Sequence, residues 1–92
     1  MTKQIEIYGH NGCAWCERAR ALATRFKQPF VYYNYTNDPA ILAELLLRGN
    51  KAGVEVRTVP QIFIGDILLG GYEDFAKAIE NGEIANFLSG EV

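Results

Sequence analysis

The sequence predicts an α/β fold in the element order β-α-β-α-β-β-α, with a mixed four-stranded sheet and helices on both faces. Short runs of β-branched and aromatic residues alternate with stretches in which apolar residues recur at helical spacing. The chain opens with a strand–helix–strand unit, which requires a right-handed crossover between parallel strands. Later, the glycine turn Gly65-Asp66 joins two strands as an antiparallel hairpin.

The first third of the chain predicts a strand, a helix and a second strand. The β-rich run Gln4–Tyr8 forms the first strand and ends at Gly9. From 13 to 27, apolar positions recur at helical spacing, and alanine and arginine, which favour helix, fill much of the rest. Pro29 follows as a stop signal, and the β-branched and aromatic run 30–35 forms the second strand.

The middle of the chain predicts a second helix and a loop. The Asp38 side chain can accept a hydrogen bond from a free backbone N–H, and Pro39 fits the first helical position. Gly49 is expected to close this helix. Its apolar stripe is formed by Ile41, Leu42, Leu45 and Leu46. Residues 50–58 show no clear period and are expected to form a loop.

The last third predicts the hairpin and a final helix. A strand is expected over 59–64, with Pro60 near its start, and the returning strand over 67–69. A helix is expected over 72–80, because apolar residues lie on one face. A short helical turn is expected to follow around 84–88.

Composition limits the function classes. The 92 residues predict one domain spanning 1–92. With 49% hydrophobic and 22% charged residues, the chain can form a packed core and is not a disordered segment. A net charge of -2 without a basic patch argues against nucleic acid as a partner. No apolar run approaches the ~18 residues of a membrane span. We expect a cytoplasmic monomer.

The segment Cys13-Ala14-Trp15-Cys16 is the most informative part of the sequence. It follows a strand and opens a helix, a position typical of a dithiol redox site. Free N–H groups and the helix dipole favour a thiolate on Cys13, so we expect it to be exposed with a lowered pKa. Cys16 lies one turn inward, within reach of the Cys13 sulfur. The pair predicts an attacking thiol and a resolving thiol.

Two other interpretations of the cysteines remain open. A structural zinc site needs four ligands, whereas the chain offers two cysteines, His10 and an acidic fourth ligand yet to be named. Alternatively, both cysteines are inert core residues. That interpretation suits Cys16, on the apolar face of the helix, better than Cys13, which follows Gly12 at a chain break.

Three segments form one pattern in order and spacing. They are Cys13-Ala14-Trp15-Cys16, Thr58-Val59-Pro60-Gln61-Ile62-Phe63-Ile64 and Gly70-Gly71-Tyr72-Glu73-Asp74-Phe75. Together they resemble the small bacterial or phage dithiol glutaredoxins, over Ile5 to about Ile79. The resemblance implies the thioredoxin fold and a redox-active Cys13–Cys16 disulfide. It also implies glutathione as reductant and co-substrate, with no obligatory metal.

The resemblance implies a glutathione groove as well. In the family, the Thr-Val-Pro segment carries a cis proline facing the dithiol, here Pro60. The backbone of the preceding residue, Val59, pairs with the cysteine of glutathione. A glycine turn holds the γ-glutamyl end, and the acidic side chain of Asp74 pairs with its amino group. The implied glutathione-binding residues are Trp15, Arg57, Thr58, Val59, Pro60, Gly71, Tyr72 and Asp74.

Several of these positions also have ordinary structural interpretations. Arg57 reads equally well as a solvated loop residue, and Glu73 as a plain helix cap. Trp15 stands where the family usually has tyrosine and is expected to wall the groove. Ala14 replaces the usual proline, and His10 stands where relatives often carry lysine or arginine.

The predicted function is a glutathione-dependent thiol–disulfide oxidoreductase that reduces protein disulfides and glutathione mixed disulfides. Ribonucleotide reductase is a candidate electron acceptor by resemblance. One alternative is a protein of the same fold reduced by thioredoxin reductase, against which the motif Gly71–Asp74 argues. The other is a glutathione-bridged iron–sulfur dimer that carries a cluster.

Overall fold

The computed structural model describes residues 3–89 and contains the predicted mixed sheet. The strands are β1 (Ile5–Gly9), β2 (Phe30–Asn34), β3 (Gln61–Ile64) and β4 (Ile67–Gly70), in the spatial order β2-β1-β3-β4. β1 is parallel to β2 and antiparallel to β3, and β3 is antiparallel to β4. The parallel crossover and the hairpin predicted from the sequence are therefore both confirmed.

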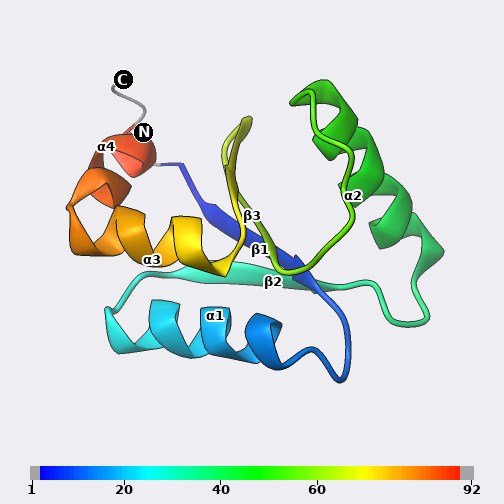
Figure 1. Ribbon diagram of the computed structural model, residues 1–92, viewed down its shortest axis with the longest axis horizontal. Coiled ribbons are helices and arrows are strands. Elements are labelled where there is room, and N and C mark those ends of the chain that lie inside the picture. The colour runs from blue at the N-terminus through cyan, green and yellow to red at the C-terminus, as the bar shows by residue number, and fades with distance from the viewer. Residues whose placement is uncertain (1–2, 90–92) are drawn as a thin grey trace.

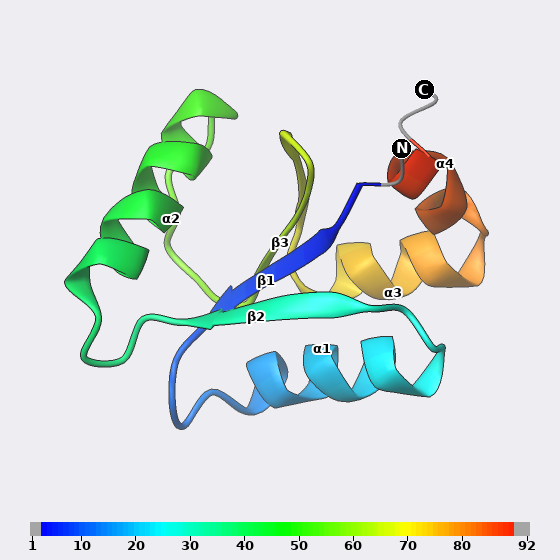
Figure 2. The ribbon, with the colours of Figure 1, turned by 180° about the vertical axis from the view of Figure 1, so that it is seen from behind.

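Helices cover both faces of this sheet, as Figures 1 and 2 show from opposite sides. They are α1 (Ala14–Arg25), α2 (Pro39–Lys51), α3 (Tyr72–Glu80) and α4 (Glu83–Ser89). α1, α3 and α4 pack on one face, and α2 packs on the other. Within residues 3–89, no helix is long and apolar enough to cross a membrane.

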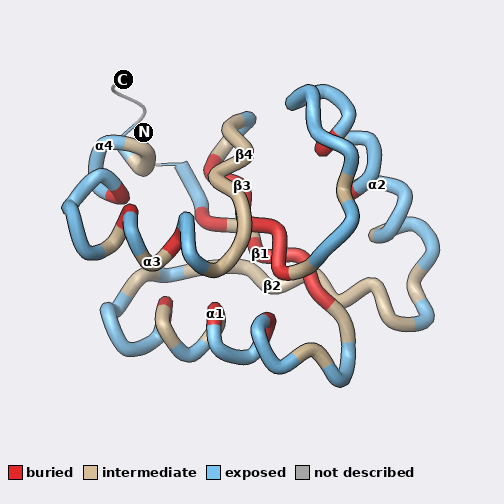
Figure 3. The backbone as a smooth tube through the Cα atoms, viewed as in Figure 1, coloured by how far each residue is buried: buried red, intermediate tan, exposed pale blue. Residues whose placement is uncertain are grey.

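The core has a larger and a smaller half, one on each face of the sheet. Ile5 and Ile7 of β1 point to the face of α1, where they meet Phe75 of α3. Tyr8 points to the other face and packs with Leu45 of α2 and with β3. This alternation follows from the two-residue period of a strand. Because both faces are covered, the central strands β1 and β3 are the most buried part of the chain (Figure 3).

A polar network ties α2 to the sheet. The Tyr8 hydroxyl donates to the Glu44 carboxylate, and Arg48 donates to the Tyr8 oxygen at 2.9 Å. Arg48 also pairs with Glu6 at 3.2 Å and donates to the Gly65 carbonyl at 2.8 Å. Burial, and then the hydrogen bond to Glu44, raise the pKa of Tyr8 to about 12. Tyr8 therefore stays protonated and remains a donor at neutral pH.

The second helix departs from the prediction in two ways. It continues past Gly49 to Lys51, because Gly49 is buried within the helix rather than closing it. A Cβ at Gly49 would lie 2.5 Å from the Val56 side chain, so this glycine allows a close approach of the following loop. The predicted apolar stripe is only partly buried: Leu45 is 1% exposed, whereas Leu42 and Leu46 are 36% and 47% exposed.

Other element boundaries shift slightly. β3 begins at Gln61 and not at residue 59, because Pro60 has no N–H to offer the sheet. The first helix begins one residue late, with Cys13 outside it as its N-cap. The predicted cap of the second helix is confirmed, since the Asp38 carboxylate accepts from the Ile41 N–H at 3.2 Å.

Candidate active site

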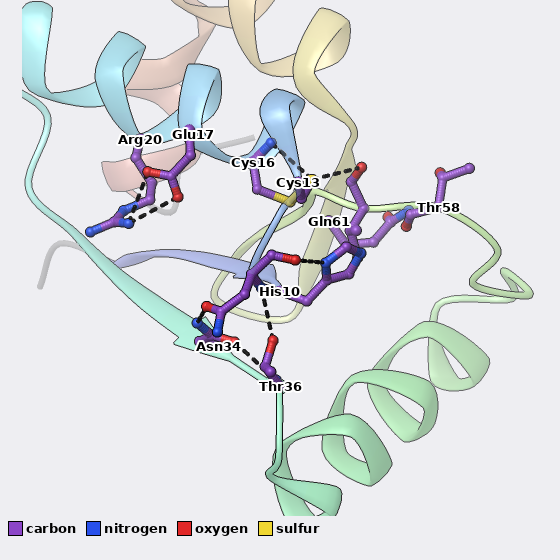
Figure 4. The surroundings of a disulfide bond; sticks show 11 residues. His10, Cys13, Cys16, Glu17, Arg20, Asn34, Thr36, Thr58 and Gln61 are labelled. Atoms are coloured by element: carbon purple, nitrogen blue, oxygen red, sulfur yellow. Dashed lines mark hydrogen bonds and ion pairs between the residues drawn. A yellow bond between two sulfur atoms is a disulfide. The ribbon is translucent and has the colours of Figure 1, made fainter.

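The cysteine pair lies at the N-terminus of α1 and forms a disulfide with a Cα–Cα distance of 5.2 Å (Figure 4). Cys13 has extended backbone angles, φ -95° and ψ 104°, which make it the N-cap of the helix. It is half-buried, whereas Cys16 is 0% exposed. An incoming thiol can therefore reach Cys13, and Cys16 is the sulfur held inside.

The helix start polarises the outer sulfur. The backbone N–H of Cys16 points at Cys13 Sγ, 3.1 Å away. When the disulfide opens, this N–H and the positive end of the helix stabilise a thiolate on Cys13. The sulfur also lies 3.8 Å from the Val59 carbonyl oxygen, so the segment before Pro60 flanks it directly.

The loop that delivers Cys13 is fixed to the end of β2. The Asn11 N–H donates to Thr36 Oγ1 at 2.8 Å, and the Asn34 side chain donates to Asn11 Oδ1 at 2.7 Å. His10 Nδ1 donates to the Asn11 carbonyl at 2.7 Å, and its ring packs edge-on against Tyr35. These contacts hold the entry to α1, and with it the position of the outer cysteine.

The Val59–Pro60 peptide bond is cis, as the resemblance implied. The following residue, Gln61, is 7% exposed and donates from its side-chain amide to the Thr58 carbonyl at 2.8 Å. This hydrogen bond fixes the segment Thr58–Pro60, which lies next to the Cys13 sulfur. The sequence interpretation gave Gln61 no role, because a side chain that reaches back three residues leaves no periodic signal.

A groove of about 340 Å³ lies beside the disulfide. It is lined by Trp15, Thr58, Val59, Pro60, Gly71, Tyr72, Glu73 and Asp74. Trp15 is 49% exposed, and its ring centroid lies 5.2 Å from that of Tyr72, while the Arg18 guanidinium lies 4.3 Å above it. As expected, Trp15 is a wall of the groove and not a core residue.

Arg57 is the one implied glutathione residue that does not line this groove. It pairs with Glu55 at 3.1 Å, and its side chain is 77% exposed. It borders a neighbouring hollow that also contains His10 and Cys13. Arg57 is therefore exposed and paired with Glu55, and it lies outside the groove that contains Asp74.

Asp74, expected from the resemblance to bind the amino group of glutathione, also caps a helix. Its carboxylate accepts a hydrogen bond from the Gly71 N–H at 3.1 Å, which caps the start of α3. Glu73 stands in the same turn and is exposed. Asp74 thus places a negative charge at the far end of the groove while fixing the helix that forms it.

One residue near the cysteines was missed from the sequence altogether. The Tyr32 hydroxyl of β2 and the Cys16 side chain both lie next to the Cα of Gly9. From the sequence, Gly9 was interpreted only as the end of a strand. Gly9 was the available signal, since a glycine in a strand marks a close approach of other groups.

The fold and the cysteine pair define a dithiol–disulfide redox site at a helix start beside a cis proline. Within residues 3–89, no group of three or more His, Cys, Asp or Glu side chains is arranged to hold a metal ion. Comparisons with known proteins identify the class. The glutaredoxin family model matches residues 5–69.

Individual relatives agree with that match. Glutaredoxin 1 of Escherichia coli K12 is 40% identical over 82 residues, covering 84% of this chain and 93% of that protein. The solution structure of glutaredoxin from Brucella melitensis has a TM-score of 0.73 at 29% identity, covering 99% of this chain and 95% of that chain. The chain belongs to the glutaredoxin family, has its thioredoxin fold, and is a thiol–disulfide oxidoreductase.

A third comparison concerns the fold alone. The crystal structure of a buckwheat glutaredoxin–glutathione complex has a TM-score of 0.72 at 23% identity, covering 95% of this chain and 77% of that chain.

Proposed function

We propose that this glutaredoxin takes its electrons from glutathione and reduces protein disulfides and glutathione mixed disulfides through Cys13 and Cys16. The observation that carries the proposal is the groove that runs from Trp15 and Val59, whose carbonyl oxygen lies 3.8 Å from the Cys13 sulfur, to the start of α3. Its volume falls in the range of small-molecule sites, about 300–1,000 Å³. Glutaredoxins use glutathione as their reductant, and a buckwheat glutaredoxin was crystallised with it.

The two ends of the groove suit the two ends of the ligand. At one end, the Val59 backbone lies beside Cys13, where the cysteine of glutathione would present its sulfur. At the other end, the N-terminus of α3 favours a carboxylate, and Asp74 favours an ammonium group. The γ-glutamyl end of glutathione carries both groups on one carbon.

The reaction follows from the accessibility of the two sulfurs. A glutathione thiolate attacks Cys13 Sγ and forms a mixed disulfide, while the Cys13–Cys16 bond breaks and its electron pair stays on Cys16. A second glutathione thiolate attacks the glutathione sulfur and releases Cys13 as a thiolate. Glutathione disulfide leaves, and the two cysteines are reduced. The reduced Cys13 then attacks the substrate disulfide.

Asp74→Asn tests the groove. Asparagine keeps an oxygen that can accept from the Gly71 N–H, so the helix cap is retained while the charge is lost. We expect the KM for glutathione to rise several-fold with kcat nearly unchanged, because this contact lies far from the reacting sulfur. Turnover of a glutathionylated peptide, coupled to glutathione reductase, measures both constants.

Glu80→Gln is the matched control, since it makes the same charge change in the same helix at an exposed position outside the groove. It should leave the KM close to that of the unmodified protein. Equal effects of the two substitutions would mean that only the overall charge matters, and a fall in kcat alone would reject Asp74 as a binding residue. Replacing glutathione and its reductase by thioredoxin reductase tests the other electron donor. Ribonucleotide reductase is assayed as an acceptor in the same way.

A further inference from the structure

The Tyr32 hydroxyl is a buried polar group with no hydrogen-bond partner, the one such side-chain atom within residues 3–89. Burying a hydroxyl without a partner is unfavourable, because the group loses its hydrogen bonds to water and gains none in return. The Tyr8 hydroxyl, by contrast, donates a hydrogen bond to Glu44 on the opposite face of the sheet. The unpaired Tyr32 hydroxyl on β2 therefore requires an explanation.

Its surroundings identify the group that it faces. Gly9 ends β1 beside β2, and it has no side chain. A Cβ placed there would lie under 3.0 Å from both the Tyr32 oxygen and Cys16 Sγ. The hydroxyl and the inner sulfur therefore share the space that Gly9 leaves free. Cys16 is 0% exposed, so bulk solvent does not reach its sulfur.

We propose that Tyr32 is a catalytic residue of the dithiol reaction, whose hydroxyl donates a hydrogen bond to the Cys16 sulfur when the disulfide is reduced. A sulfur in a disulfide is a poor acceptor, whereas a thiolate is a strong one. The donor is thus unpaired in the oxidised protein and paired in the reduced one. The proposal concerns Cys16 and does not depend on glutathione being the reductant.

The proposed step is a thiol–disulfide exchange. An external thiolate forms a bond to Cys13 Sγ, the Cys13–Cys16 bond breaks, and the electron pair remains on Cys16. Tyr32 keeps its proton and donates only a hydrogen bond, and the Cys16 thiolate is later protonated from water. In the reverse direction, the same bond supports the Cys16 thiolate as it attacks the mixed disulfide on Cys13.

The charged groups around Tyr32 keep it a donor. Burial raises the pKa of Tyr32, and Glu17 of α1 raises it further. Arg20 of α1, whose guanidinium lies 4.4 Å above the ring, lowers it, and Tyr35 on the other side raises it. The net direction of the pKa shift is upward from 10.0, so the hydroxyl stays protonated at neutral pH.

The first test measures the pKa of Cys16 in a Cys13→Ser protein, from the chemical shift of ¹³Cβ-labelled cysteine. Adding Tyr32→Phe should reduce the fraction of Cys16 thiolate about tenfold at a given pH, which is one pKa unit. Tyr33→Phe is the matched control, because Tyr33 is the next residue of β2 and packs on the opposite face. An unchanged Cys16 pKa in Tyr32→Phe would overturn the proposal.

The second test separates the hydrogen bond from a general structural effect. In protein glutathionylated at Cys13, Tyr32→Phe should slow the release of glutathione by Cys16 about threefold. The tenfold loss of thiolate is partly offset by the higher nucleophilicity of the more basic thiolate. In a Cys16→Ser background, Tyr32→Phe should not change turnover of mixed disulfides. An equal loss in that background would assign Tyr32 to packing alone.

A measurement on the unsubstituted tyrosine covers the case in which Tyr32→Phe fails to fold. The ¹³Cζ shift of Tyr32 should follow the ionisation of Cys16 in Cys13→Ser protein. It should show no such step once Cys16 is also replaced by serine. A flat shift through the Cys16 titration would equally overturn the proposal.

Discussion

Gly9→Ala would place a methyl group in the space shared by the Tyr32 hydroxyl and the inner cysteine. The new Cβ would lie 2.7 Å from Cys16 Sγ and 3.0 Å from Cys16 Cβ, with the Tyr32 oxygen closer still. Cys16 cannot swing away, because it is fully buried and tied to Cys13. Either α1 or β2 must move to accommodate the methyl group.

Overpacking of this kind destabilises a protein by about 1–3 kcal/mol. For a domain of this length, each kcal/mol lowers Tm by about 4–8 °C, so the expected loss is roughly 4–24 °C. Thermal unfolding of the oxidised protein, followed by circular dichroism, measures it. Gly71→Ala is the control, because a Cβ there has only the Pro60 carbonyl nearby, at 3.7 Å. Its effect should stay within about 1 kcal/mol.

Combining Gly9→Ala with Tyr32→Phe tests the geometry directly. Phenylalanine removes the atom that the new methyl group meets first, so part of the lost stability should return. Coupling between contacting residues of about 0.5–3 kcal/mol is expected. A Gly9→Ala protein as stable as the unmodified one, or one whose loss simply adds to that of Tyr32→Phe, would refute this description of the space.

Two further predictions concern the cysteines and the network around Tyr8. Cys13→Ser should abolish reductase activity, whereas Cys16→Ser should keep activity on glutathione mixed disulfides, because glutathione itself can resolve them; the reverse pattern would exchange their roles. The raised pKa of Tyr8, about 12 against a usual 10.0, means that the folded protein holds this proton more tightly than the unfolded chain. The free energy of unfolding should therefore fall from about pH 10 towards pH 12, by up to about 3 kcal/mol, and Tyr8→Phe should flatten that fall. Urea unfolding across this pH range measures it, and an equally steep fall in Tyr8→Phe would contradict the assignment.

The fold was largely predictable because its signals are local. The Asp38-Pro39 cap, the Gly65-Asp66 turn and the short β-rich runs each specify a few residues of backbone, and each is found where expected. The end of α2 was not predictable. Gly49 has the local character of a helix stop, but its contact with Val56 allows the helix to continue.

In the site, too, the residues close together in the sequence were predictable, and the contacts between distant segments were not. Cys13 and Cys16 are adjacent along one helix, so their spacing alone indicates their chemistry. Arg57 was assigned to the groove by resemblance to the family, with a solvated loop residue as the alternative, and here its exposed side chain pairs with Glu55. Tyr32 reaches the site from another strand; the sequence predicts that β1 and β2 pair, but not the register that brings Tyr32 beside Gly9 and Cys16.

The attachment of α2 has a consequence for local opening. This helix buries only Leu45 and Gly49, and Arg48 supplies much of its remaining connection to the sheet. A segment with so few buried contacts opens at a lower free energy than the whole domain. The disulfide lies at the start of α1, whose buried residues Ala19 and Ala23 lie in the larger half of the core. α2 can therefore detach as a cooperative unit, widening the hollow next to His10 while the cysteines keep their places.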